Sequence, residues 1–203
     1  SAYAIGGGPL LVSTIESNYR VDIDNYASVD FSSMANIIDL VGGVDLEVST
    51  QEAGYINMYL DEQCRLQGLN ASDYYVAGGG ITHLNGNQAV GFARIRYTSR
   101  GNEHSDYGRT SRQREILVQL MQKARSLDAT TLLAVVNNML PLITHNIDAA
   151  TLTTLIANAP SYINYDIQTD RIPYDGLYSN LGEELVPDFE ATINRLHQTI
   201  YGN

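Results

Sequence analysis

The chain has 203 residues, a formal net charge of −11 and a single cysteine, Cys64. That length supports one well-buried core and is small for two, so we expect one domain over residues 1–203. The acidic balance argues against nucleic acid as a partner, because duplex binding needs a basic face. One cysteine excludes an intramolecular disulfide and a multi-cysteine zinc site. No segment has the length and apolar character of a membrane helix.

Hydrophobic periodicity predicts helices and strands in alternation along the chain. Helices are expected over residues 9–18, 30–41, 50–68, 88–92, 108–127, 128–143, 148–158 and 187–201. Strands are expected over residues 18–29, 44–48 and 165–173, and exposed loops over 69–80 and 174–184. Asp30 or Ser32 can cap the second helix, which Gly42-Gly43 ends. This alternation predicts an α/β fold with helices on both faces of a sheet.

Arginine is concentrated in one stretch, residues 94–114. Six of the twelve Lys and Arg residues of the chain fall there: Arg94, Arg96, Arg100, Arg109, Arg112 and Arg114. On a strand, Arg94 and Arg96 would point to the same face. On a helix that begins near Ser105, three residues lie three to four positions apart and share a face: Arg109, Arg112 and Gln113. A strand and the helix after it can thus direct several guanidinium groups to one point.

The choice of arginine indicates a phosphate-rich ligand. A guanidinium binds two phosphate oxygens at once and stays charged at any working pH. The N-terminus of the following helix would add backbone donors and a positive dipole. The alternative interpretation is a surface arginine cluster balanced by Glu103, Asp106 and Glu115.

A soluble phosphate held by the same arginines would instead indicate a phosphohydrolase, which needs a group that activates water. The histidines of the chain are His83, His104, His145 and His197, and no two of them have metal-ligand spacing. His104, inside the arginine stretch, is the one candidate, and its alternative interpretation is an exposed loop histidine.

Three segments together resemble the LytR-CpsA-Psr family. They are VDFSSMANIIDLVGGVDLEV, HLNGNQAVGFARIR and SDYGRTSRQREILVQLMQKA. The opening AYAIGGGPLLVSTIE and the closing IPYDGLYSNLGEELVPDFEATI extend the likeness over nearly the whole chain. Its most specific part combines the paired arginines of ARIR with the run D-x-x-R-x-x-R-Q at residues 106–113.

The resemblance implies a fold, a location and an activity. The fold would be a central mixed β-sheet flanked by helices on both faces. Members are anchored outside the cytoplasmic membrane, mostly of Gram-positive bacteria, and bind polyprenyl phosphate and pyrophosphate lipids. They transfer a glycopolymer, such as wall teichoic acid or capsular polysaccharide, to peptidoglycan through a phosphodiester bond, and Mg²⁺ assists.

The family motif also implies roles for individual residues. Arg94 and Arg96 match the paired arginines that hold the pyrophosphate, and Asp106 matches the acidic residue before the helix. The resemblance makes these the expected catalytic residues: Arg94, Arg96, Asp106 and Arg109. The expected substrate-binding residues are Arg94, Arg96, Arg109, Arg112 and Gln113. A helix N-cap or a salt bridge to an arginine is the alternative role for Asp106, and we expect Arg100 to lie outside the contacts to the ligand.

The apolar tail of such a lipid needs a dry groove. The candidates for its lining are Ile37, Leu40, Phe92, Leu117 and Leu120. For each of them individually, ordinary core is the preferred interpretation.

In the family, the aspartates that hold Mg²⁺, a further arginine and a lysine lie before the AYA segment, whereas this sequence begins at Ser1. We therefore expect the N-terminal strands and the membrane anchor to be missing, no metal ligands in this chain, and little or no transferase activity by the chain alone. The alternative function is a non-catalytic module that binds polyprenyl phosphate or the cell wall.

Overall fold

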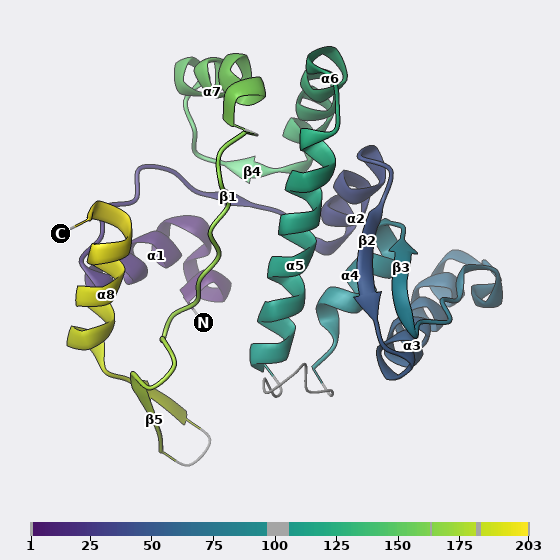
Figure 1. The fold of residues 1–203 in the computed structure, drawn as a ribbon, viewed down its shortest axis with the longest axis horizontal. Helices are drawn as coiled ribbons and strands as arrows, with labels where there is room; N and C mark the ends of the chain where they lie inside the picture. Colours follow the sequence, from purple (N-terminus) through teal and green to yellow (C-terminus); the bar gives the residue numbers. More distant parts are fainter. Residues whose placement is uncertain (1, 97–105, 163, 182–183, 203) are drawn as a thin grey trace. The chain divides into compact units, whose positions relative to one another are not determined.

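The computed structural model describes residues 2–96, 106–162, 164–181 and 184–202. They form two compact units, whose helices and strands are labelled in Figure 1. The first unit comprises Ser1–Ser28, His145–Ile147 and Gln168–Asn203, and the second comprises Val29–Thr144 and Asp148–Ile167. The single domain expected over residues 1–203 stays a prediction.

The second unit contains most of the regular structure. Its elements are α2 (Phe31–Leu40), β2 (Val44–Val48), α3 (Thr50–Gln67), η1 (Ala71–Tyr74), β3 (Gly80–Leu84), α4 (Gly86–Arg94), α5 (Asp106–Arg125), α6 (Ala129–Met139), η2 (Leu140–Leu142) and α7 (Ala149–Tyr162). β2 and β3 pair antiparallel, from Val44 opposite Leu84 to Val48 opposite Gly80. Within this order, β2, α3 and α4 occur where the sequence predicts a strand, a helix and a helix.

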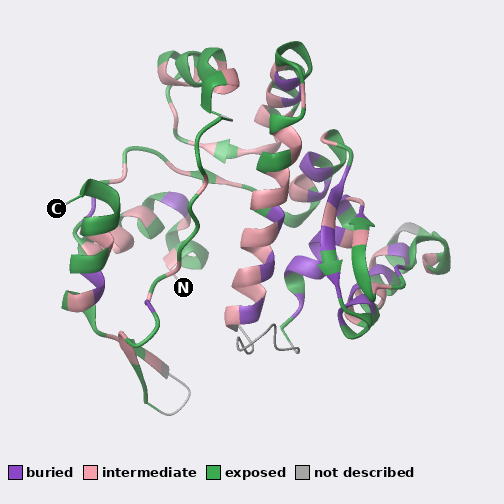
Figure 2. Ribbon diagram, viewed as in Figure 1, coloured by how far each residue is buried: buried purple, intermediate pink, exposed green. Residues whose placement is uncertain are grey.

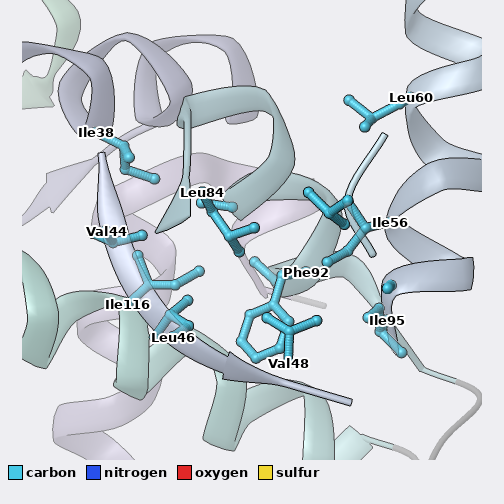
Figure 3. Close-up of a cluster of buried hydrophobic side chains, with 14 residues drawn as sticks. Ile38, Val44, Leu46, Val48, Ile56, Leu60, Leu84, Phe92, Ile95 and Ile116 are labelled. Carbon is cyan, nitrogen blue, oxygen red and sulfur yellow. The ribbon is translucent and has the colours of Figure 1, made fainter. Parts of the chain in front are cut away.

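The core of this unit lies between the β2–β3 pair and the helices α2, α3, α4 and α5. Alternate residues of β2, Val44, Leu46 and Val48, are buried, because successive side chains of a strand point to opposite faces. Figure 3 shows Ile56, Phe92 and other side chains from the helices packed against this face of β2. Figure 2 shows that buried positions gather along β2 and the helices beside it.

Local caps define the ends of these helices. Asp30 Oδ1 accepts from the Ser33 backbone N–H at 2.7 Å, which decides between the two predicted caps of α2 in favour of Asp30. Gly42 and Gly43 both have left-handed φ values, +79° and +83°, and end that helix as predicted. A Cβ on Gly86 would lie 2.0 Å from the Ala35 carbonyl oxygen, so the close approach of α4 to α2 requires a glycine there.

The first unit contains α1 (Ala2–Tyr19), β1 (Ala27–Ser28), β5 (Tyr178–Leu181), β6 (Glu184–Pro187) and α8 (Phe189–Tyr201), and β4 (Thr144–His145) lies at its boundary. α1 is interrupted at Gly6 and Gly7, where the backbone is not helical. β5 and β6 pair antiparallel. α1 and α8 pack together, with the Tyr19 and Phe189 rings 5.9 Å apart and an ion pair between Arg20 and Glu190.

Several predicted strands differ from the structure. Of residues 18–29, only Ala27–Ser28 is a strand. Asn18 and Tyr19 belong to α1, the backbone is left-handed at Arg20, where φ is +53°, and residues 21–26 form no strand. The described part of 165–173 is irregular, whereas the predicted loop at 174–184 contains β5.

The sheets are also smaller than expected. The described strands form only two-stranded sheets, so the described residues do not build a larger central mixed sheet. β3 was not predicted, because the two large apolar residues of its sequence GITHL, Ile81 and Leu84, are three positions apart. They therefore do not show the alternation of apolar and polar residues that is typical of a half-buried strand.

Candidate functional site

A cavity of about 500 Å³ lies within the second unit, between α2, α3, the end of α4 and the start of α5. Its wall brings together four residues that the sequence predicts as site residues: Arg94, Arg96, Arg109 and Gln113. Two segments that are separated along the chain thus meet at one hollow, as the arginine pattern predicts.

Arg94 and Arg96 reach this cavity by a different backbone from the one expected. Arg94 is the last residue of α4, and Ile95 follows it in extended conformation with φ −62° and ψ 125°. Ile95 is buried at 3% exposure, while both flanking arginines are exposed. The two arginines therefore share a side, as predicted, but at the end of a helix and not on a strand.

The Arg94 guanidinium makes cation–π contacts with two aromatic rings. Its Cζ is 4.6 Å from the centroid of the Tyr59 ring and 5.1 Å from that of the Phe31 ring. A Cβ on Gly91 would lie 2.9 Å from Tyr59 Cδ1, so a glycine allows this ring to approach α4 closely. The two ring contacts restrict the guanidinium, and its N–H groups can bind a ligand.

Arg109 and Gln113 lie four residues apart on α5 and line the same cavity. This spacing places both side chains on one face of the helix. Asp106 is the first residue of α5, but its side chain lies outside the described residues. Its catalytic role stays a prediction. Arg100, Glu103 and His104 also lie outside the described part of the chain.

Arg112 departs from its predicted role as a substrate contact. Its side chain is fully buried, at 0% exposure, and does not line the cavity. Nε donates to Glu52 Oε1 at 2.9 Å, and one terminal nitrogen donates to the Ile95 carbonyl oxygen at 3.3 Å. The reason is its place on α5: Arg112 shares a face with the core residue Ile116, whereas Arg109 and Gln113 share the adjacent one.

A second, more apolar cavity of about 280 Å³ lies next to the first and shares Phe31, Ala93 and Gln113 with it. The residues that it adds are Val29, Asp30, Met34, Val90, Ile116 and Leu117.

Of the five candidates for an apolar groove, Leu117 alone lines this second cavity. Ile37 and Phe92 are buried at 3% and 0% exposure, so they are core. Leu40 is on the surface, and Leu120 packs against the core. An apolar residue on a helix face has the same signature whether it meets another side chain or a hollow, so sequence could not separate these cases.

The aromatic and acidic residues of the first cavity were not predicted from the sequence. Tyr55, Tyr59 and Glu62 project into it from α3, at the three- to four-residue spacing of one helix face. That spacing was the available signal. Glu62 is the one carboxylate on the described wall, together with three arginines, so the described residues of this wall have a net positive charge that favours an anion.

The described residues contain no group of three or more His, Cys, Asp or Glu side chains that could hold a metal ion. His83 lies away from the cavity and pairs with Asp45, with Nδ1 2.8 Å from Oδ1. Within the described ranges, the helices include none that is both long and apolar enough to span a membrane.

Fold and cavity together define an α/β protein with an arginine-lined site for an anion and an apolar extension. The LytR_cpsA_psr family model matches residues 1–196, and the chain belongs to this family. The resemblance recognised in the sequence is thus confirmed.

Two similar proteins are both described as teichoic acid transferases. The chain is 32% identical over 126 residues to the polyisoprenyl-teichoic acid–peptidoglycan teichoic acid transferase TagV of Bacillus subtilis (strain 168), an alignment covering 62% of this chain and 29% of the relative. It is 28% identical over 145 residues to TagU of Enterococcus faecalis, a transferase of the same description, covering 68% of this chain and 40% of the relative. The chain thus spans less than half the length of these relatives.

Solved structures confirm the α/β fold. A structure of TagT bound to LIIa-WTA matches with a TM-score of 0.66 at 18% identity, covering 97% of this chain and 69% of that one. The crystal structure of B. subtilis TagV matches with a TM-score of 0.62 at 22% identity, covering 97% and 72%.

Proposed function

We propose that this chain is the ligand-binding body of a cell-envelope glycopolymer transferase. The protein binds a glycopolymer linked to polyprenyl phosphate or pyrophosphate and transfers it to peptidoglycan through a phosphodiester bond. The observation that carries the proposal is the meeting of Arg94, Arg96 and Arg109 at one cavity that adjoins an apolar one.

The arginines suit phosphoryl transfer. In such reactions the protein mainly positions the phosphates and neutralises charge on the equatorial and leaving oxygens. Arg94, restricted by two rings, presents a guanidinium edge of defined orientation. Arg96 and Arg109 add two more positive groups from separate segments, so a pyrophosphate can bind to all three.

The second cavity would hold the start of the prenyl chain. Gln113 and Phe31 line both cavities and therefore lie where a phosphate would join a prenyl chain. The Gln113 amide can donate to an ester or phosphate oxygen. Met34, Ile116 and Leu117 supply apolar surface to the first isoprene units.

The names of the relatives support the substrates and the location. The curated relatives are described as teichoic acid transferases that act between a polyisoprenyl-linked teichoic acid and peptidoglycan. By this family likeness, we assign the protein to the outside of the cytoplasmic membrane, held there by a membrane anchor and in contact with the lipid, the glycopolymer and peptidoglycan.

Mg²⁺ is part of the proposal for the whole protein. The residues described here do not fit a Mg²⁺ site by themselves, because this ion needs several oxygen ligands and the described wall offers one carboxylate, Glu62. No step assigned to the arginines depends on the ion.

Calorimetry with farnesyl pyrophosphate, with and without Mg²⁺, tests the binding step. An Arg94→Ala, Arg96→Ala variant should bind at least about 100-fold more weakly, since a hydrogen bond to a charged group contributes about 1.5–3 kcal/mol. Equal binding by the variant would refute the assignment of the cavity.

A transfer assay with a lipid-linked glycopolymer and peptidoglycan then tests the reaction. Product formation that depends on Arg94 and Arg96 supports the transferase. Binding without transfer would identify a non-catalytic module that binds polyprenyl phosphate.

A further inference from the structure

The ion pair between Glu52 and Arg112 lies buried behind the arginine-lined cavity. The two side chains are 4% and 0% exposed, and Arg112 Nε is 2.9 Å from Glu52 Oε1. By contrast, the ion pair that α5 makes further along, Lys123 with Asp45, is partly exposed. Desolvating two charges can cost more than their mutual attraction returns, so a pair buried this deeply is weak evidence for a purely stabilising role.

Glu52 is fixed by a cap at the start of α3. Its Oε2 accepts from the Ser49 backbone N–H at 2.9 Å and from the Ser49 hydroxyl at 2.8 Å. Its own N–H donates to the same hydroxyl at 3.2 Å, which completes a capping box. The other oxygen, Oε1, is thereby aimed at Arg112, and the carboxylate fixes the plane of the guanidinium.

Arg112 in turn holds the backbone between the two cavity arginines. Its terminal nitrogen donates to the Ile95 carbonyl oxygen at 3.3 Å. α4 ends at Arg94, and carbonyl groups at a helix C-terminus have no partner within the helix. Arg112 supplies a partner at this point, where the chain turns from α4 towards Arg96.

We propose that the Glu52–Arg112 pair is a positioning device for Arg94 and Arg96, and that Arg112 acts through the Ile95 carbonyl and not on the ligand. This inference rests on the proposed phosphate-binding function of the cavity. The Ile95 side chain is anchored in the core, so fixing its carbonyl as well leaves the two flanking arginines little freedom to turn away.

The substitution Arg112→Lys separates positioning from folding. Lysine keeps a positive charge beside Glu52, so the buried carboxylate is not left unpaired. A single ammonium lacks the planar fork that bonds the carboxylate and the Ile95 carbonyl in fixed directions. Glu52→Gln is the second variant, since it retains a cap acceptor for Ser49 and removes the charge that orients Arg112.

Lys123→Gln is the matched control. Lys123 lies on the same helix and pairs with Asp45 at 2.8 Å, but it does not line the cavity. All variants are first compared by circular dichroism and thermal unfolding, and binding is measured well below the lowest Tm.

Two measurements decide the inference. Farnesyl pyrophosphate should bind to Arg112→Lys roughly tenfold to a hundredfold more weakly, as expected when one hydrogen bond to a charged group is lost. The control should stay within about twofold. Without ligand, hydrogen exchange in a peptide that contains residues 93–96 should be faster in Arg112→Lys and Glu52→Gln than in the control.

A double-mutant cycle distinguishes positioning from direct contact. If Arg112 acts through the cavity arginines, the double variant Arg112→Lys, Arg96→Ala should lose less affinity for farnesyl pyrophosphate than the product of the two single fold-losses. A loss equal to that product would show an independent contact with the ligand, and native binding and exchange in Arg112→Lys would show a purely structural pair. Failure of the unaltered chain to bind the probe would refute the proposed function, while the exchange data would still decide whether Arg112 holds residues 93–96.

Discussion

The two rings around Arg94 offer a direct test of how the cavity is preorganised. The perturbation is the pair of substitutions Phe31→Leu and Tyr59→Leu, which keep apolar volume but remove both rings that lie 5.1 Å and 4.6 Å from the Arg94 Cζ. Each cation–π contact at a partly exposed site contributes about 0.5–1 kcal/mol. Their loss frees a long side chain that must be ordered again when a phosphate binds.

The size of the effect follows from that ordering. Immobilising one flexible side chain on binding costs about 0.5–1.5 kcal/mol, which corresponds to roughly a twofold to twelvefold weaker affinity. Calorimetry with farnesyl pyrophosphate measures it, and Tyr74→Leu is the control, since Tyr74 is an exposed tyrosine that does not line the cavity.

The same ring substitutions made in an Arg94→Ala background test whether the rings act through Arg94. In that background the two ring substitutions should have no further effect on affinity, because the side chain that they restrict is gone. An undiminished loss in the Arg94→Ala background would show that the rings contact the ligand themselves. Unchanged affinity in the ring variant would show that Arg94 needs no restriction.

Three further predictions concern packing, the apolar cavity and pH. Gly86→Ala should lower the free energy of unfolding by about 1–3 kcal/mol or more, measured by urea denaturation, because its Cβ would meet the Ala35 carbonyl oxygen at 2.0 Å. Leu117→Gln should weaken the binding of farnesyl pyrophosphate but not of inorganic pyrophosphate, and equal losses for both would contradict an apolar role for the second cavity. Hydrogen bonds from Lys123 and then His83 lower the pKa of Asp45, so its contribution to stability is present above the unfolded value of about 3.9 and is lost as the pH falls through the folded value. Asp45→Asn should therefore reduce the loss of unfolding free energy on acidification, measured by urea denaturation at several pH values. The same decrease in both proteins would show that Asp45 makes no such contribution.

Much of the second unit was predictable from sequence, because its signals are local. Asp30 caps its helix, as expected, and Asp128 and Asp148 cap the helices that were predicted to start there, since a cap depends on residues within three positions of it. The strand Val44–Val48 was predictable for a similar reason: its alternation of apolar and polar residues matches one buried and one open face. Residues 18–29 show the limit, since a similar alternation there formed a strand only at Ala27–Ser28.

For the site, the sequence by itself determined which residue types are available and which of them can share a helix face. Helical spacing grouped Arg109 and Gln113 with Arg112, and both their spacing and the family motif singled out Arg94 and Arg96. Only the tertiary structure decided that Arg112, one residue from Gln113, turns inward to Glu52, which lies 60 positions earlier in the chain. Helical spacing places a side chain on a face, but whether that face meets a cavity or a buried carboxylate depends on which other helix packs against it.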